Sequence, residues 1–131
     1  MNFSTKTDQE ILAIAEPIWE SISQGSNEVN YEKFSKHFSK KMLQAVPETE
    51  LRRQMEENNP EGDFLLPDRD FISCIRHETG VSVLWKGRIS KVNGECLLVL
   101  LLDEEDSEIK VFSAWFRNFT AKCKKASENS A

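Results

Sequence analysis

The sequence predicts an α+β fold in which three N-terminal helices pack on one face of a curved, four-stranded antiparallel sheet. Helical periodicity of apolar residues is confined to residues 8–58, whereas strand-like alternation and hairpin signals fill residues 71–117. Helices and strands that do not alternate along the chain are typical of helices layered on an antiparallel sheet. We therefore expect the strands to follow one another as a meander under the helices.

The first predicted helix begins at a capping box and ends at a glycine. Thr7 and Glu10 have the spacing at which each side chain accepts a hydrogen bond from the other's backbone amide. Pro17 falls outside the apolar stripe, so we expect a bend there rather than a break. Gly25 is the predicted C-cap. The apolar stripe spans roughly 160° of the helix surface, and it consists of Ile11, Leu12, Ile14, Ala15, Ile18, Trp19 and Ile22.

Two shorter helices are predicted between residues 30 and 58. Asn30 suits the N-cap of the second helix, and Pro47 suits the first position of the third helix. The second helix carries an apolar stripe at helical spacing, formed by Tyr31, Phe34, Phe38 and Met42. We interpret this stripe as core, with the wall of a ligand cavity as the alternative. The third helix has few apolar anchors, which predicts a peripheral position.

The four predicted strands are joined by short turns. The first strand covers residues 71–78 and is expected to place Phe71, Ser73, Ile75 and His77 on one side. The second strand points Val81, Val83, Trp85 and Ile89 inward. Asn93-Gly94 is a strong hairpin signal, because a type I′ turn needs two residues with positive φ. Residues 103–107 are expected to close the next hairpin.

The third and fourth strands carry apolar residues on both faces. Residues 96–102 contain no polar position, and residues 109–116 divide Ile109, Val111 and Trp115 from Phe112, Ala114 and Phe116. Three small helices cover one face only, and large exposed apolar patches usually mark interfaces. We therefore predict a homodimer formed sheet to sheet through Leu97, Val99, Leu101, Phe112 and Phe116. The alternative is a strongly curled sheet that buries both faces within one chain.

Composition and charge exclude several classes of protein. The length of 131 residues predicts one domain over residues 1–118, followed by a flexible polar tail at 119–131. A net charge of −5 argues against a nucleic-acid partner. The three cysteines are widely spaced and form no metal motif, so we expect neither a metal nor another cofactor. Without a signal peptide or a long apolar run, the protein is expected to be cytoplasmic with no membrane partner.

The predicted arrangement resembles the nuclear transport factor 2 / ketosteroid isomerase superfamily, also called SnoaL-like, over about residues 8–118. The resemblance rests on the long first helix, the segment Asn30–Ser39, the Pro-Glu-x-Glu-Leu start of the third helix at Pro47, and the meander ending at residues 109–116. It is greatest with bacterial branches of unknown function. The resemblance implies a cone-shaped fold, in which enzymes of the family place an acid or base and hydrogen-bond donors inside the cone mouth.

We predict a non-catalytic module that binds a ligand or another protein and dimerises through its sheet. A small apolar ligand would occupy a pocket formed by Trp19, Tyr31, Phe34, Phe38, Trp85 and Trp115. The alternative is an enzyme of the isomerase, dehydratase or cyclase kind that uses His77 with Asp68 or Asp70. We favour the non-catalytic interpretation, because the sequence carries no catalytic signature.

Overall fold

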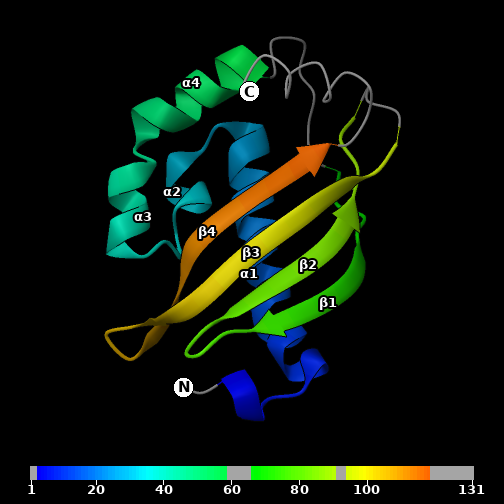
Figure 1. Cartoon of the computed structure of the whole chain (residues 1–131). Coiled ribbons are helices and arrows are strands. Elements are labelled where there is room, and N and C mark those ends of the chain that lie inside the picture. The colour runs from blue at the N-terminus through cyan, green and yellow to red at the C-terminus, as the bar shows by residue number, and fades with distance from the viewer. Residues whose placement is uncertain (1–2, 59–65, 91–93, 119–131) are drawn as a thin grey trace, which may run out of the picture.

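The computed structural model describes residues 3–58, 66–90 and 94–118, and it has the predicted α+β fold (Figure 1). All helices precede all strands along the chain. The helical elements are the 3₁₀ turn η1 and helices α1–α4, at Phe3–Thr5, Asp8–Glu28, Tyr31–Phe34, Lys40–Ala45 and Glu48–Asn58. The strands β1–β4 are Asp70–Arg76, Val81–Gly87, Cys96–Glu105 and Glu108–Asn118.

The four strands form one open antiparallel sheet in the order β1-β2-β3-β4. Each strand pairs with its neighbour in sequence, as the predicted meander requires. Helix α1 crosses behind the sheet in Figure 1, and the opposite face of the sheet is turned toward the viewer. The sheet therefore has one face covered by the helical layer and one face that no described helix crosses.

The hydrophobic core lies between α1 and the covered face of the sheet. Trp19 of α1 and Trp85 of β2 meet there with ring centroids 5.6 Å apart. Alternate residues of β2 and β3 point into this layer and are almost fully buried: Val81, Val83, Trp85, Cys96, Leu98, Leu100 and Leu102. The predicted inward face of the second strand is confirmed for Val81, Val83 and Trp85.

Helix α1 confirms the predicted capping box and passes through Pro17 without interruption. The helix does not end at Gly25, as predicted, but continues to Glu28, with Val29 in the left-handed conformation as C-cap. Gly25 is instead buried against α2. A β-carbon there would lie 2.3 Å from the backbone nitrogen of Phe34. The glycine thus permits a close approach of two helices rather than ending one.

The second predicted helix is divided into α2 and α3, because the chain between them joins the sheet. The Val111 amide donates to the carbonyl of His37 (2.7 Å), and the Ser39 amide donates to the carbonyl of Val111 (2.9 Å). This short parallel bridge brings Phe38 beside β4, where its side chain is buried. Ser39 then caps α3 by accepting a bond from the Met42 amide. The predicted third helix corresponds to α4.

Two β-bulges change which face several side chains occupy. In β1 the register shifts between Phe71 and Ser73, so Phe71 pairs with Trp85 on the covered face, whereas Ser73 and Ile75 lie on the other face. The prediction that Phe71 shares a face with Ser73 and Ile75 is therefore wrong. A bulge adds one residue to a strand and so reverses the facing of the residues beyond it.

The second bulge lies in β4 at Phe112. The register of β3 with β4 passes from Leu102↔Val111 to Leu101↔Ser113, which leaves Phe112 as the extra residue. Phe116 then pairs with Leu98 on the covered face, and Trp115 pairs with Val99 on the other. The predicted faces of Trp115 and Phe116 are thus exchanged, and Phe116 does not join Leu97, Val99 and Leu101.

The turn between β3 and β4 is shorter than predicted. Both strands continue to the pair Glu105↔Glu108, so only Asp106 and Ser107 form the loop, each with positive φ. The predicted Asn93-Gly94 hairpin falls partly outside the described residues, although Gly94 itself has a φ of 96°. The predicted tail at 119–131 also lies outside them.

Candidate interaction surface

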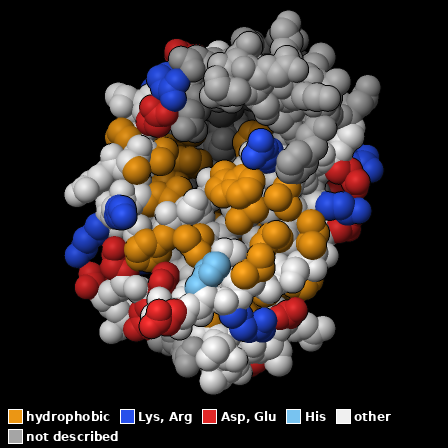
Figure 2. All heavy atoms as spheres, in the orientation of Figure 1, with side chains coloured by type: hydrophobic (Ala, Val, Ile, Leu, Met, Phe, Trp, Pro, Cys, Tyr) orange, Lys and Arg blue, Asp and Glu red, His pale blue; other side chains and the backbone are white. Residues whose placement is uncertain are grey.

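The face of the sheet opposite the helices is the candidate functional surface, and we call it the open face. Residues directly opposite each other in antiparallel strands share a face, so the strand register assigns its members. They are Ser73, Ile75, His77, Ser82, Leu84, Lys86, Leu97, Val99, Leu101, Asp103, Ser113 and Trp115, together with the charged residues Asp70, Lys110 and Arg117. Figure 2 shows hydrophobic side chains gathered across this face.

The centre of the open face is apolar. One row across the sheet contains Leu84, Val99 and Trp115, and the next contains Ile75 and Leu101. Ile75 is 51% exposed and Trp115 is 44% exposed, whereas Val99, between Leu84 and Trp115, is only 9% exposed. A contiguous exposed apolar patch of this kind is typical of an interaction site.

Charged residues lie at the two ends of the open face. At one end Lys86 pairs with Glu95 at 3.4 Å. At the other end Asp103 accepts a hydrogen bond from the hydroxyl of Thr79 at 2.9 Å and lies opposite Lys110 in the strand register, and the Lys110 ammonium pairs with Glu108 at 3.2 Å. An apolar centre with a polar rim is the usual composition of a protein–protein interface.

The predicted interface residues fall into two groups. Leu97, Val99 and Leu101 lie on the open face, as expected from their alternation in β3. Phe112 is the bulge residue, and Phe116 lies on the covered face with 46% of its surface exposed. Trp115 takes the place on the open face that the sequence assigned to Phe116. A one-residue bulge leaves no clear mark in an apolar run, so alternation alone could not locate it.

The proposed acid–base residues do not come together. His77 follows the end of β1, and its Nε2 atom lies 2.7 Å from the hydroxyl oxygen of Ser82. Asp70 is the first residue of the same strand, and seven residues of extended chain separate the two by roughly 23 Å. Asp68 precedes the strand and is exposed. Neither aspartate therefore reaches the imidazole.

Most of the residues predicted to line a ligand pocket fill the interior instead. Trp19, Phe38 and Trp85 are buried, and Phe34 packs edge-on against Phe38 with centroids 5.0 Å apart. The hydroxyl of Tyr31 donates to the carbonyl of Val46 at 2.7 Å, which ties α2 to the end of α3. Trp115, the sixth predicted residue, lies on the open face.

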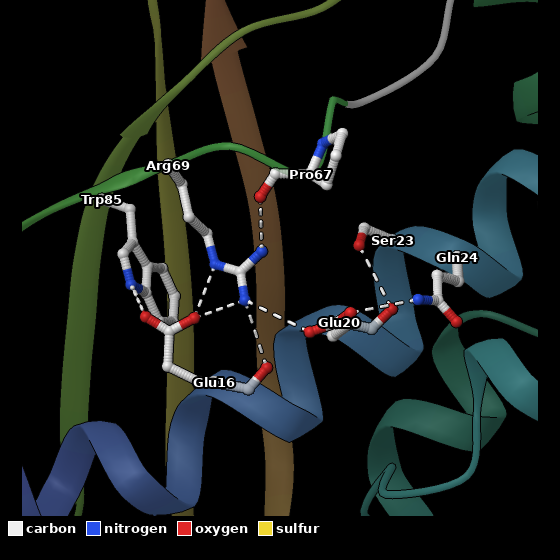
Figure 3. A network of polar contacts seen from close by, with 7 residues as sticks. All are labelled: Glu16, Glu20, Ser23, Gln24, Pro67, Arg69 and Trp85. Carbon is white, nitrogen blue, oxygen red and sulfur yellow. Dashed lines mark hydrogen bonds and ion pairs between the residues drawn. The ribbon is translucent and has the colours of Figure 1, made fainter.

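A polar network that the sequence did not reveal joins α1 to the segment before β1 (Figure 3). Arg69 donates from Nε to the carboxylate of Glu16 at 2.8 Å and from Nη1 to the carbonyl of Pro67 at 3.1 Å. The other carboxylate oxygen of Glu16 accepts a bond from the indole nitrogen of Trp85 at 3.0 Å. The Arg69 guanidinium also lies over the ring of Trp85, 5.7 Å from its centroid. Because each polar group already has a partner, we assign this network a structural role.

A depression on the surface lies between α1 and residues 30–36. Its volume is about 700 Å³, and it is open to solvent. Polar and charged side chains form most of its lining, with Pro17, Glu20, Ser21, Gln24, Asn30, Glu32, Lys33 and Lys36. Small-molecule sites usually enclose most of the surface of their ligand, whereas this depression is open to solvent.

In the described part of the chain, the side chains that could bind a metal ion or act as thiols are not gathered into a site. Within residues 3–58, 66–90 and 94–118 there is no cluster of three or more His, Cys, Asp or Glu side chains fit to bind a metal ion. Burial raises the pKa of the Cys74 and Cys96 thiols, which favours the unreactive protonated form. Burial also lowers the pKa of His37, helped by the positive charges of Lys36 and Lys110.

Comparison with known proteins adds no family assignment. Among the described helices, none combines the length and apolar character needed to cross a bilayer. No family model matches the chain, and no curated protein matches it either.

Proposed function

We propose that this protein is a non-catalytic interaction module that forms a homodimer through the open face of its sheet. The observation that carries the proposal is the apolar row Leu84, Val99 and Trp115, which crosses three strands on a face that no described helix covers. Ile75, Leu97 and Leu101 extend this surface on the neighbouring rows. Burying apolar surface contributes about 25 cal/mol per Å², so a partner that covers this face gains binding energy.

The size of the open face suits a second copy of the chain. The four strands contain 7, 7, 10 and 11 residues. At about 3.3 Å per residue and 4.8 Å between strands, the face measures roughly 29 by 19 Å, or about 550 Å². Two copies would bury about 1,100 Å² or more, which is just above the area that a specific interface needs. We therefore expect a reversible dimer.

The edges of the sheet are less suitable for association than its face. Strand β1 carries the bulge at Phe71–Ser73, and strand β4 carries the bulge at Phe112. The backbone of Val111 on the β4 edge is already bonded to His37 and Ser39. Bulges and covered edges are ways in which proteins prevent strand-to-strand association. This protection favours face-to-face packing.

The alternatives have less support. An enzyme that uses His77 with Asp68 or Asp70 would need groups that the fold holds at opposite ends of a strand. A small apolar ligand between helices and sheet would need space that Trp19, Phe38 and Trp85 occupy. We also propose membership of the nuclear transport factor 2-like superfamily, and the order of a long first helix, short helices and an antiparallel meander supports it.

The substitution Ile75→Lys tests the proposed interface. Ile75 is 51% exposed, so lysine is tolerated in the monomer, but its charge would be desolvated between two sheets. We expect the wild type to sediment as a dimer at tens of micromolar and the variant as a monomer. Leu43→Lys is the matched control, since Leu43 is 40% exposed on α3, and it should leave the dimer intact. A wild type that sediments as a monomer, or two variants that behave alike, would contradict the proposal.

A further inference from the structure

An imidazole reaches into the apolar part of the open face. His77 follows β1, and its amide donates to the carbonyl of Gly80 at 2.8 Å, which fixes the turn. Its Nε2 atom lies 2.7 Å from the hydroxyl oxygen of Ser82. Ser82 in turn lies between Ile75 and Leu101 in the second apolar row. The ring is therefore placed on the surface that a second copy would cover.

Among the described residues, no carboxylate forms a hydrogen bond or an ion pair with the His77 ring. Its hydrogen-bond partner is a neutral hydroxyl group rather than a carboxylate. In the row of His77 itself, Gly80 lies between His77 and Asp103, whose carboxylate accepts a hydrogen bond from the Thr79 hydroxyl at 2.9 Å. Lys110 lies opposite Asp103 in the strand register, and its ammonium pairs with Glu108 at 3.2 Å.

Two further charges adjoin His77 in sequence. Glu78 occupies the turn between β1 and β2 and is exposed. Arg76 lies opposite Val81 on the covered face, where it binds Asp8 at 2.8 Å and the carbonyls of Phe3 and Lys6. Helices α1–α4 contribute no charge here, because none of them crosses the open face in Figure 1.

We propose that His77 makes the dimer sensitive to pH, with the neutral ring allowing association and the protonated ring opposing it. This inference rests on the dimer proposed above. Covering the open face removes water from the ring, and removal of water disfavours a charged group that lacks an opposite charge. Imidazole is the side chain whose ordinary titration falls between pH 5 and 8. Each dimer contains two such rings, so their effects on the dimer dissociation constant multiply.

The expected effect is large enough to measure. If the dimer accepts only neutral rings, the two rings of each dimer together weaken association as the pH falls from 7.5 to 5.5, and we expect the dissociation constant to rise by at least about tenfold. Sedimentation equilibrium of the full chain at these two pH values measures the dimer dissociation constant directly.

Two histidine variants separate the switch from general effects of acid. His77→Gln retains a neutral hydrogen-bonding group near Ser82, so we expect a dimer at pH 7.5 whose dissociation constant changes less than about threefold at pH 5.5. His37→Gln alters the other histidine of the chain, and it should retain the wild-type dependence. His77→Asn serves if the glutamine variant does not fold by circular dichroism.

The outcomes of this experiment are distinct. A wild-type dimer whose dissociation constant is the same at both pH values would overturn the switch and leave the dimer standing. An equal weakening in wild type and His77→Gln would also overturn it. A wild type that is monomeric at both pH values would overturn the dimer and the switch together.

Discussion

At the scale of single residues, Arg69 is the side chain on which the packing of α1 against the chain before β1 depends. Only 9% of its side chain is exposed, and its guanidinium contacts Glu16, Glu20, Pro67 and Trp85. Removing the partner of a largely buried charge costs more than removing an exposed ion pair. Glu16 is therefore expected to matter more for stability than its neighbours on the same helix.

The substitution Glu16→Gln tests this expectation. We expect a loss of about 2 kcal/mol in the free energy of unfolding, because a hydrogen-bonded charge is removed beside a buried guanidinium. Glu20→Gln is the control, since the Glu20 carboxylate lies 3.9 Å from Arg69 and is 55% exposed. The Glu20→Gln substitution should lower the free energy of unfolding by less than about 0.5 kcal/mol. Urea unfolding measures both, and equal losses would show that Glu16 has no special role.

The lowered pKa of His37 leads to a separate prediction about how the stability of the fold depends on pH. Burial, with Lys36 and Lys110 nearby, lowers the pKa of His37 in the folded protein. The unfolded chain then binds more protons in the range below about pH 6.5, so stability falls as the pH drops through that value. His37→Gln should lose less stability than wild type between about pH 7.5 and pH 5.5 in urea unfolding. A variant with the same loss as wild type would refute this assignment.

At the scale of elements, the contact between α1 and α2 depends on the absence of a side chain at Gly25. Alanine is the better helix former by about 1 kcal/mol. Its β-carbon, however, would overlap the backbone of Phe34, and overpacking of this kind costs about 1–3 kcal/mol. We expect Gly25→Ala to lower the thermal midpoint, whereas Gln24→Ala, at an exposed position of the same helix, should change it little. A Gly25→Ala protein that is more stable than wild type would show that the helices separate easily.

The elements also show what local sequence patterns can and cannot predict. The capping box at Thr7 and Glu10 and the inward face of β2 follow from local chemistry, and both are confirmed. The division between α2 and α3 depends on hydrogen bonds from His37 and Ser39 to Val111, more than seventy residues away. Bonds to a distant strand leave no periodic signal in the helix itself.

The sequence predicted only part of the candidate surface, because the rest depends on how distant strands pair. The alternation in β3 places Leu97, Val99 and Leu101 on one face without any information from other strands. The contribution of β4 depends on the bulge at Phe112, which brings Trp115 to the open face and turns Phe116 away from it. The Arg69–Glu16 pair could not be predicted, because an arginine in a polar segment has no pattern that identifies its partner on a helix.

At the scale of the whole molecule, the distribution of apolar surface is unequal between the two faces of the sheet. Helix α1 and its core residues cover one face, whereas the other presents Ile75, Leu101 and Trp115 to solvent. The edges are protected by bulges, and no comparable protection is present on the described part of the open face. This asymmetry is the physical basis of the proposed dimer and of the pH dependence assigned to His77.

The molar mass of the wild-type chain in solution tests this account most directly. Multi-angle light scattering on a dilution series at pH 7.5 distinguishes the monomer of 15.1 kDa from a species of twice that mass. We predict the doubled mass at tens of micromolar, with a decline toward the monomer value on dilution. A mass of 15.1 kDa throughout the series would contradict the central claim, because the open face would then remain uncovered by a second copy.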